Sequence, residues 1–400
     1  MRVSRLGVSL AFTCVLCGSV MAATSNPWVL KATLSAPGNP LEFGYSVGIS
    51  GNTIAATAND SIGVYVEPKA GWSNLSTPTA KLTASDGAVF SSVAICGNTI
   101  VAGSVQDGGT GAAYVFVEPS GGWKNMNETA KLTAADAASG DFVGTSVAIS
   151  GNTIVVGADQ NNSVGASFPP PEPNGAGAAY VFVKPSAGWS NMTETAKLTA
   201  SDGAAGDDFA YSVSILGNTI VASSPNATIG TTNLEGAAYI FEKSGSQWKN
   251  STESAKLTAS DGHSVTLLGM GLSISGNTLA AAAFDKVYLF FKPAGGWSTG
   301  TQNVELSSTS YTFFGLNSVA IYEGNVLAGS PYDNVPFADL YVEPAAGWKN
   351  MTPTYRLKAP AKNGNGSDGW SVAMNATTLV VSSPLFGGNG GNVVYVYGKN

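Results

Sequence analysis

Few residues of this 400-residue chain have side chains that could do chemistry, and they do not gather into a known motif. His263 is the only histidine, so a Ser-His-Asp hydrolase or a histidine-rich metal site would have to use it. It stands two residues after Asp261, in a segment that should be a surface loop. No phosphate-binding loop, dinucleotide fingerprint or His-Glu-x-x-His motif occurs. We therefore predict no catalytic residue, no metal site and no cofactor.

Carboxylates recur at a fixed place, two residues after the tripeptide Leu-Thr-Ala, as Asp86, Asp136, Asp202 and Asp261. Paired carboxylates could cleave glycosides. A catalytic pair would be expected in one or two copies only, whereas recurrence favours a turn role in which Asp caps nearby backbone N–H groups. The alternative is an enzyme that acts on extracellular polysaccharide through carboxylates on one face of the fold.

The elements that must position these residues repeat along the chain. Seven tryptophans recur 44 to 66 residues apart, and each begins a similar unit: Trp28, Trp72, Trp123, Trp189, Trp248, Trp297 and Trp348. The clearest copy predicts strands at 143–150, 153–158, 178–183 and 195–200, with a tight Gly-Asn reversal between the first two. A period near 50 with four strand signals per unit is typical of a β-propeller.

The two ends of the chain predict how the ring closes. The last repeat ends at its third strand, 393–397, whereas residues 29–34 form an outer strand with no inner strands before it. We therefore predict an all-β, seven-bladed β-propeller of four-stranded antiparallel blades, closed by the N-terminal strand, which completes the last blade. The tryptophans should lie in the turns between third and fourth strands and pack between neighbouring blades.

The repeats resemble the FG-GAP repeats of integrin-α-like propellers, of the bacterial secreted type. Phe43-Gly44 matches the aromatic-Gly half, and Gly157-Ala158-Asp159, Gly329-Ser330-Pro331 and Ser382-Ser383-Pro384 stand where Gly-Ala-Pro belongs. Three copies depart at the aromatic-Gly place, with Val89-Phe90, Leu268-Gly269 and Asp368-Gly369. The resemblance implies a seven-bladed, non-catalytic adhesion or binding propeller.

The calcium site of this family is not carried over to this chain. The calcium-binding members have an Asp/Asn-rich loop between the first and second strands, which supplies oxygens to a cation that takes six to eight of them. Here that connection is only Ser-Gly-Asn-Thr and contains no carboxylate. Asp159, Asn161 and Asn162 lie in a different loop and lack the calcium-loop pattern.

The N-terminus and the composition predict an exported protein. Residues 1–22 have the basic start, apolar stretch and small residues of a signal peptide, which leaves 23–400 as one propeller domain. That domain has 17 basic and 26 acidic residues, a formal charge of −9, which disfavours nucleic acid and anionic membranes. We expect a monomer that is secreted, periplasmic or on the cell surface and not inserted in a membrane. Its single cysteine, Cys96, stands where other repeats have serine, so we interpret it as a tolerated small residue.

The loops between the second and third strands differ most between repeats, and long irregular loops on a rigid scaffold are where binding residues collect. We predict that a protein or glycan ligand docks on that face, using Asp107, Asp159, Asn161, Asn162, Phe168, Glu172, Asn226 and Asn233. A purely structural surface protein is a further alternative. Sequons beside the tryptophans, at Asn74, Asn127, Asn191, Asn250 and Asn350, are either glycosylation sites or turn formers.

Overall fold

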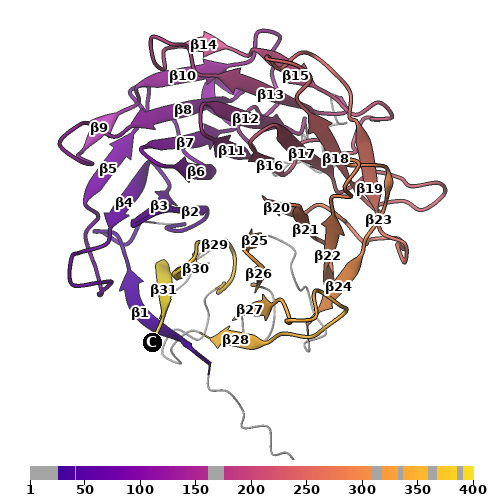
Figure 1. Cartoon of the computed structure of the whole chain (residues 1–400). Helices are drawn as coiled ribbons and strands as arrows, with labels where there is room; N and C mark the ends of the chain where they lie inside the picture. Colours follow the sequence, from indigo (N-terminus) through magenta and orange to yellow (C-terminus); the bar gives the residue numbers. More distant parts are fainter. Residues whose placement is uncertain are drawn as a thin grey trace, which may run out of the picture.

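The computed structural model describes residues 26–40, 42–160, 175–308, 318–331, 337–358, 367–384 and 391–400. The predicted leader lies outside these residues. The described chain forms seven sheets arranged as blades around a common centre (Figure 1). The all-β, seven-bladed propeller predicted from the repeats is therefore confirmed.

Each blade runs from an innermost strand a to an outermost strand d. The strands, in the order a to d, are β2 (Val47–Ser50), β3 (Thr53–Ala58), β4 (Ser61–Val66) and β5 (Ala80–Thr83) in blade one; β6 (Ser92–Cys96), β7 (Thr99–Ser104), β8 (Ala112–Val117) and β10 (Ala130–Thr133) in blade two; β11 (Val147–Ser150), β12 (Thr153–Ala158), β13 (Ala178–Val183) and β15 (Ala196–Leu198) in blade three; β16 (Val213–Leu216), β17 (Thr219–Ser224), β18 (Ala237–Glu242) and β19 (Ala255–Thr258) in blade four; β20 (Gly271–Ser275), β21 (Thr278–Ala282), β22 (Lys286–Phe291) and β24 (Val304–Ser307) in blade five; β25 (Val319–Tyr322), β26 (Asn325–Ser330), β27 (Phe337–Val342) and β28 (Tyr355–Lys358) in blade six; and β29 (Val372–Met374), β30 (Thr378–Ser383), β31 (Val393–Lys399) and β1 (Trp28–Leu34) in blade seven. One short 3₁₀ turn, η1 (Asp107–Gly109), lies in a b–c loop.

Two-residue turns join strands a and b, as predicted. In five blades the first turn residue is a glycine with φ between 56° and 58°: Gly51, Gly97, Gly151, Gly217 and Gly276. The asparagine that follows each of these glycines does not have a positive φ. A hairpin with glycine in the left-handed region at its first position matches the twist of the flanking strands.

The N-terminal strand closes the ring. β1 pairs antiparallel with β31, from Trp28 opposite Lys399 to Leu34 opposite Val394, with a bulge between Leu30 and Ala32. The pairing joins the two ends of the described chain in one sheet, at the lower left of Figure 1. This closure leaves no blade incomplete and was predicted from the strand count.

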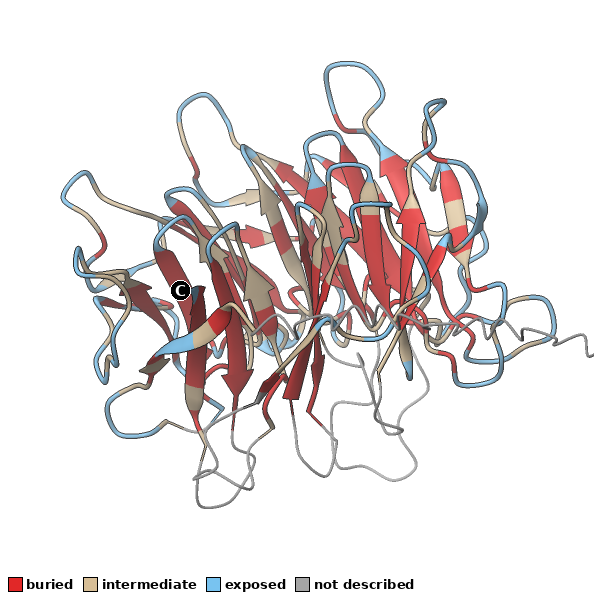
Figure 2. Ribbon diagram, turned by 60° about the horizontal axis from the view of Figure 1, so that its bottom comes forward, coloured by how far each residue is buried: buried red, intermediate tan, exposed pale blue. Residues whose placement is uncertain are grey.

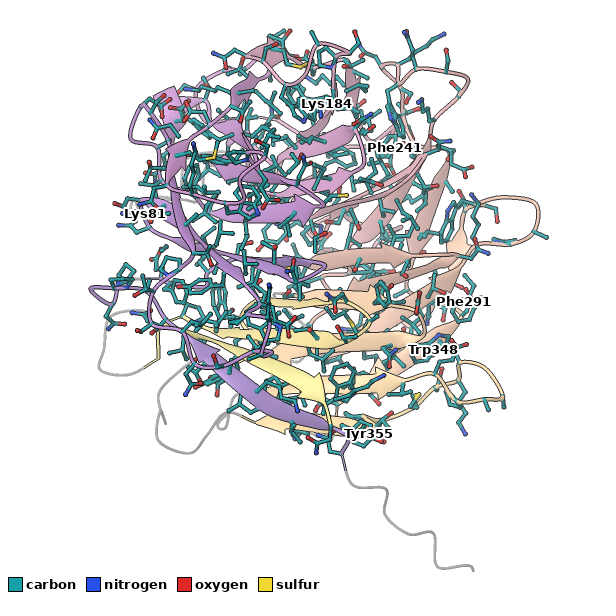
Figure 3. The ribbon with its side chains drawn as sticks, turned by 60° about the vertical axis from the view of Figure 1, so that its left-hand side comes forward. Lys81, Lys184, Phe241, Phe291, Trp348 and Tyr355 are labelled. Carbon is teal, nitrogen blue, oxygen red and sulfur yellow. The ribbon has the colours of Figure 1, made fainter. Side chains whose placement is uncertain are left out.

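The hydrophobic core is divided among the seven blade interfaces. Each of seven buried clusters combines residues of two adjacent blades with one tryptophan, for example Trp248 between blades three and four and Trp28 between blades six and seven. Phe291 and Trp348 pack against the cluster between blades five and six, and both are marked in Figure 3. Buried residues fill the strands, whereas exposed residues concentrate in the loops (Figure 2). The predicted packing role of the tryptophans is confirmed, although Trp28 lies within β1 and not in a turn.

A fifth, parallel strand joins neighbouring blades, and the sequence did not predict it. The c–d turn of one blade lies along strand d of the blade before it: β9 (Met126–Asn127) pairs with β5, β14 (Met192–Thr193) with β10, and β23 (Gly300–Thr301) with β19. Single parallel bridges, such as Leu306 with Met351, do the same elsewhere. The prediction of four-stranded antiparallel blades is therefore confirmed, and the sheets of blades one, two and four each gain a fifth, parallel strand from the next blade.

The sequon asparagines belong to these interblade contacts. The Oδ1 atoms of Asn74, Asn191, Asn250 and Asn350 accept a backbone N–H of the preceding blade's outer strand at 2.8–2.9 Å. Asn127 accepts the hydroxyl of Thr83 at 3.1 Å. These residues therefore stabilise the junctions between blades, because each satisfies a backbone donor at a strand edge or a nearby hydroxyl.

Serine hydroxyls satisfy the inner edges of the ring in a similar way. Ser46 accepts the backbone N–H of Val93, and Ser212 and Ser371 accept those of Leu272 and Val47, at 3.0–3.1 Å. The innermost strands of adjacent blades are thereby joined by side chains instead of by a ladder, and each hydroxyl satisfies a backbone donor at an unpaired edge.

Candidate functional site

The recurring carboxylates are held in a repeated interaction with lysine and tyrosine. Asp136 accepts the Tyr180 hydroxyl at 2.9 Å and the Lys197 ammonium at 2.6 Å. The other copies are Asp86 with Tyr114 and Lys131, Asp202 with Tyr239 and Lys256, and Asp261 with Tyr288 and Lys286. Each Asp lies in the crossing from one blade and binds strand residues of the next blade. The structural interpretation of these aspartates therefore holds, but their role is to join elements and not only to cap a turn.

The electrostatics of this interaction favour ionised carboxylates. The hydrogen bond from Lys197 lowers the pKa of the Asp136 carboxyl. At Asp86, burial opposes the shift, but the hydrogen bonds from Lys131 and Tyr114 outweigh it and lower the pKa. A general acid needs the opposite shift, toward neutral pH. Their lysine and tyrosine partners therefore hold all four carboxyls in the ionised form.

The b–c and d–a loops share one face of the ring, where we predicted the binding residues. Asn161, Asn162, Phe168 and Glu172 lie outside the described residues. Asp107 forms an ion pair with Lys131 at 2.6 Å, near the outer rim. Asp159 is buried and accepts the Thr145 hydroxyl at 3.2 Å. These two residues support the fold locally.

Blade four contributes the other two predicted residues. The amide of Asn226 donates to the buried carboxylate of Asp208 at 2.6 Å. Asn233 is exposed and accepts the Thr228 hydroxyl at 3.3 Å. Asn226 therefore fixes a loop, and Asn233 is the one residue of the described four that is exposed.

Two residues near Asn233 were not predicted as part of a site. Glu235 is only 6% exposed, and burial raises the pKa of its carboxyl. His263 is exposed on the adjacent crossing, and its charge lowers the pKa of Glu235 in opposition to burial. The sequence signal for Glu235 was its place before Gly236, where the two preceding repeats have Thr110 and Ala176.

The aromatic-Gly position contains a second unusual carboxylate. Phe43, Phe209 and Leu268 are fully buried there, whereas blade seven has Asp368, at 8% exposed. Burial raises the pKa of Asp368, and its Oδ1 has no hydrogen-bond partner among the described residues. An acid in a place that otherwise holds an apolar side chain is a local departure from the fold's own pattern.

Blade two requires a correction at the same position. The backbone N–H of Ser91 bonds to the oxygen of Gly103, as that of Gly44 bonds to Thr57. Phe90 is buried between blades one and two, as Phe43 is between blades seven and one. Phe90-Ser91, and not Val89-Phe90, is thus the aromatic-Gly pair; the shift arises because blade two is one residue shorter before strand a.

The face also contains a pair of aromatic rings. Tyr45 and Trp370, which precede the innermost strands of blades one and seven, lie 5.4 Å apart between ring centroids at an interplanar angle of 48°. Both are half-buried.

On the opposite face, the c–d turn of blade four encloses a depression of about 250 Å³ beside Trp248. Its residues Asn250 and Glu253 already bind blade three.

The described residues show no group of three or more potential metal ligands among His, Cys, Asp and Glu. Within the same part of the chain, no helix has the length and apolar character needed to span a membrane.

Comparison with known proteins agrees with this architecture. The family model described as FG-GAP repeat matches residues 77–116, 126–182 and 192–241. Three repeats of this chain thus match the FG-GAP repeat, and the chain folds as a seven-bladed β-propeller. Among solved structures, it is similar to the crystal structure of the WD40 beta propeller domain of Doa1, with 12% identity and a TM-score of 0.56. That match covers 93% of this chain and 97% of the other, and it shows the fold alone. The comparison with curated proteins found no match.

Proposed function

We propose that this FG-GAP propeller is a non-catalytic binding module of the extracellular space or cell surface, and that it binds its ligand with the b–c and d–a face. The observation that supports this is the difference between the two faces. In five blades the a–b turn is two residues long and begins with a glycine at φ 56–58°. The b–c connections range from residues 59–60 in blade one to 159–177 in blade three. Variable loops on an invariant scaffold are a common arrangement of binding sites.

The chemistry of the repeated polar residues supports binding over catalysis. The Lys, Asp and Tyr side chains at the blade junctions hydrogen-bond to one another, and their serine and asparagine counterparts satisfy backbone donors. A protein or glycan ligand would contact the remaining loop residues without disturbing these bonds. Export, which the N-terminal segment predicts, fits such a role.

A binding screen tests the proposal. The protein is applied to immobilised glycans and matrix proteins, beside a variant in which residues 160–176 are replaced by a three-residue turn and a variant in which 227–234 are shortened. Ser190→Ala, in a c–d turn on the opposite face, is the control. Loss of a ligand in a loop variant, with retention in the control, would support the assignment. Equal binding by all four proteins would place the ligand elsewhere.

A further inference from the structure

The crossings into blades three, four and five contain the same four-residue turn, which allows a comparison within the molecule. In residues 138–141, 204–207 and 263–266 the fourth backbone N–H bonds to the first carbonyl oxygen at 3.0–3.2 Å. The side chain of the fourth residue also accepts the first N–H, at 2.8–2.9 Å. The three turns are therefore equivalent, residue by residue.

The third residue of this turn has a left-handed backbone. It is Gly140 at φ 91° and Gly206 at φ 88° in two copies, but Val265 at φ 70° in the third. A left-handed backbone costs a non-glycine residue about 1–2 kcal/mol, and β-branched side chains are especially rare there. The Val265 side chain is 39% exposed and belongs to no buried cluster, so it does not repay this cost by packing.

A second glycine is replaced beside Val265. Gly109 and Gly175 of the b–c loops accept the N–H groups of Gly140 and Gly206, at 3.0 and 3.4 Å. The corresponding residue of blade four is Leu234, with φ 56° and 38% exposure. Its carbonyl oxygen accepts the N–H of Leu267 in the crossing at 3.0 Å, so the two loops lie side by side. Leu234 and Val265 are thus two of the five large hydrophobic residues that are exposed in the described chain.

A buried acid lies directly beside this pair. Glu235 takes the place of Thr110 and Ala176, as the matching backbone bonds to Val143, Phe209 and Leu268 show. Gly262 makes room for it, because a Cβ there would meet the Glu235 side chain at 2.2–2.6 Å. The charged groups near Glu235 are His263, Lys256 and Asp261, and its side chain hydrogen-bonds to Thr232. Lys256 is bound by Asp202, so it does not neutralise Glu235 directly.

We propose that Leu234, Glu235 and Val265 form a docking site for a protein segment that presents a lysine or arginine beside an apolar residue. The inference rests on the proposed function and names the partner of that face. The apolar pair would contact the partner's apolar side chain and the alkyl part of its cation, and Glu235 would bind the charged end. The acidic chain, with a formal charge of −7, favours approach of a basic partner. Backbone strain that packing does not explain is found at sites kept for function.

The only histidine offers a direct measurement, because the imidazole C–H signals in the proton NMR spectrum come from His263 alone. The probe is the blocked peptide acetyl-Gly-Leu-Lys-Leu-Gly-amide. We expect a saturable shift of the His263 signal, and no shift with the peptide in which Glu replaces Lys. Val265→Gly and Glu235→Gln should each weaken binding by about tenfold. Leu216→Ser, an exposed leucine on the opposite face, should leave it unchanged.

Val265→Gly restores the residue of the two sibling turns, so it should fold at least as well as the natural chain, which circular dichroism will verify. The absence of a saturable shift, or unchanged affinity in both site variants, would overturn the docking site. The docking site and the broader binding function can be tested separately. A ligand from the glycan and matrix screen that binds Val265→Gly and the natural chain equally would refute this site and leave the binding function standing.

Discussion

Asp368 should lower the free energy of unfolding of the propeller, and replacing it by leucine should raise that free energy. The equivalent Leu268 is fully buried and is also followed by a glycine, so a leucine fits this backbone. Gly369 and Gly269 make the same bond, to Ser382 and Ala282, at 2.9 and 2.8 Å. Burying a leucine side chain contributes about 2 kcal/mol. For a domain of this size that corresponds to a rise in Tm of about 3 °C.

The pH dependence of the stability gain distinguishes its two causes in Asp368→Leu, which are the removal of a buried carboxyl and the burial of a leucine side chain. Burial raises the folded-state pKa of Asp368, so its contribution to stability is fully present below the unfolded pKa, which is about 4. That contribution is lost as the pH rises through the folded pKa. The gain in Asp368→Leu should therefore be larger at pH 7.5 than at pH 4, when measured as the difference in unfolding free energy from the natural chain.

Asp368→Asn is the matched control, since it removes the titration without adding apolar surface. Its gain over the natural chain should grow with pH as that of Asp368→Leu does, because only the natural chain titrates here, but it should give only part of the stabilisation at neutral pH. The difference between the Leu and Asn variants should be independent of pH. Chemical denaturation followed by tryptophan fluorescence measures all three proteins at both pH values. A destabilised Asp368→Leu, or a gain that does not grow with pH, would refute the reasoning and indicate that the carboxylate has a partner that stabilises it.

Four further predictions concern the ring as a whole. Deleting residues 26–34 should unfold all blades in one transition, because β1 is the only outer strand of blade seven; a preserved multi-blade core in hydrogen exchange would contradict this. Asn191→Ala should lower the free energy of unfolding by about 1 kcal/mol, because it removes the side-chain oxygen that accepts the backbone N–H of Lys131. Ser190→Ala should be neutral in the same melting assay. Tyr180→Phe should cost about 1 kcal/mol at pH 7 and less near pH 2, since Asp136 has a lowered pKa and its contribution is lost as the pH falls. EDTA should leave the Tm unchanged, because the a–b turns require no ion; a fall of several degrees would show that a cation stabilises the fold.

The fold was predictable from the sequence because the same strand and turn signals recur in each of the seven repeats. The alternation of apolar residues, the Gly-Asn reversals and the period near 50 specify strands a, b and c locally, so strands such as β12 and β13 begin and end where the sequence placed them. Strand a was predicted from 143, but it begins at Val147, because the preceding residues cross from the neighbouring blade. The closing pair β1 and β31 followed from counting strands alone.

The candidate site was much less predictable, for a physical reason. A recurring Asp beside a turn looks locally like a turn former, and only the packing of two blades reveals that Tyr180 and Lys197 lie within hydrogen-bond distance of Asp136. The parallel strands β9, β14 and β23 are two residues long and pair across blades, so no local pattern identifies them. The binding residues predicted from loop length include Asp107 and Asn226, which support loops and rims.

The sequence alone determined the class of fold, the number of blades and the manner of closure, because these follow from local periodicity repeated seven times. Only the tertiary structure decided which departures from the pattern cost stability. Val265 is an ordinary residue in the sequence, and its left-handed backbone appears only when its turn is aligned with those of Gly140 and Gly206. Asp368 likewise becomes a buried acid only when blades six and seven close around it. Local patterning encodes strands and turns, whereas burial and strain arise from contacts between segments that are distant in the sequence.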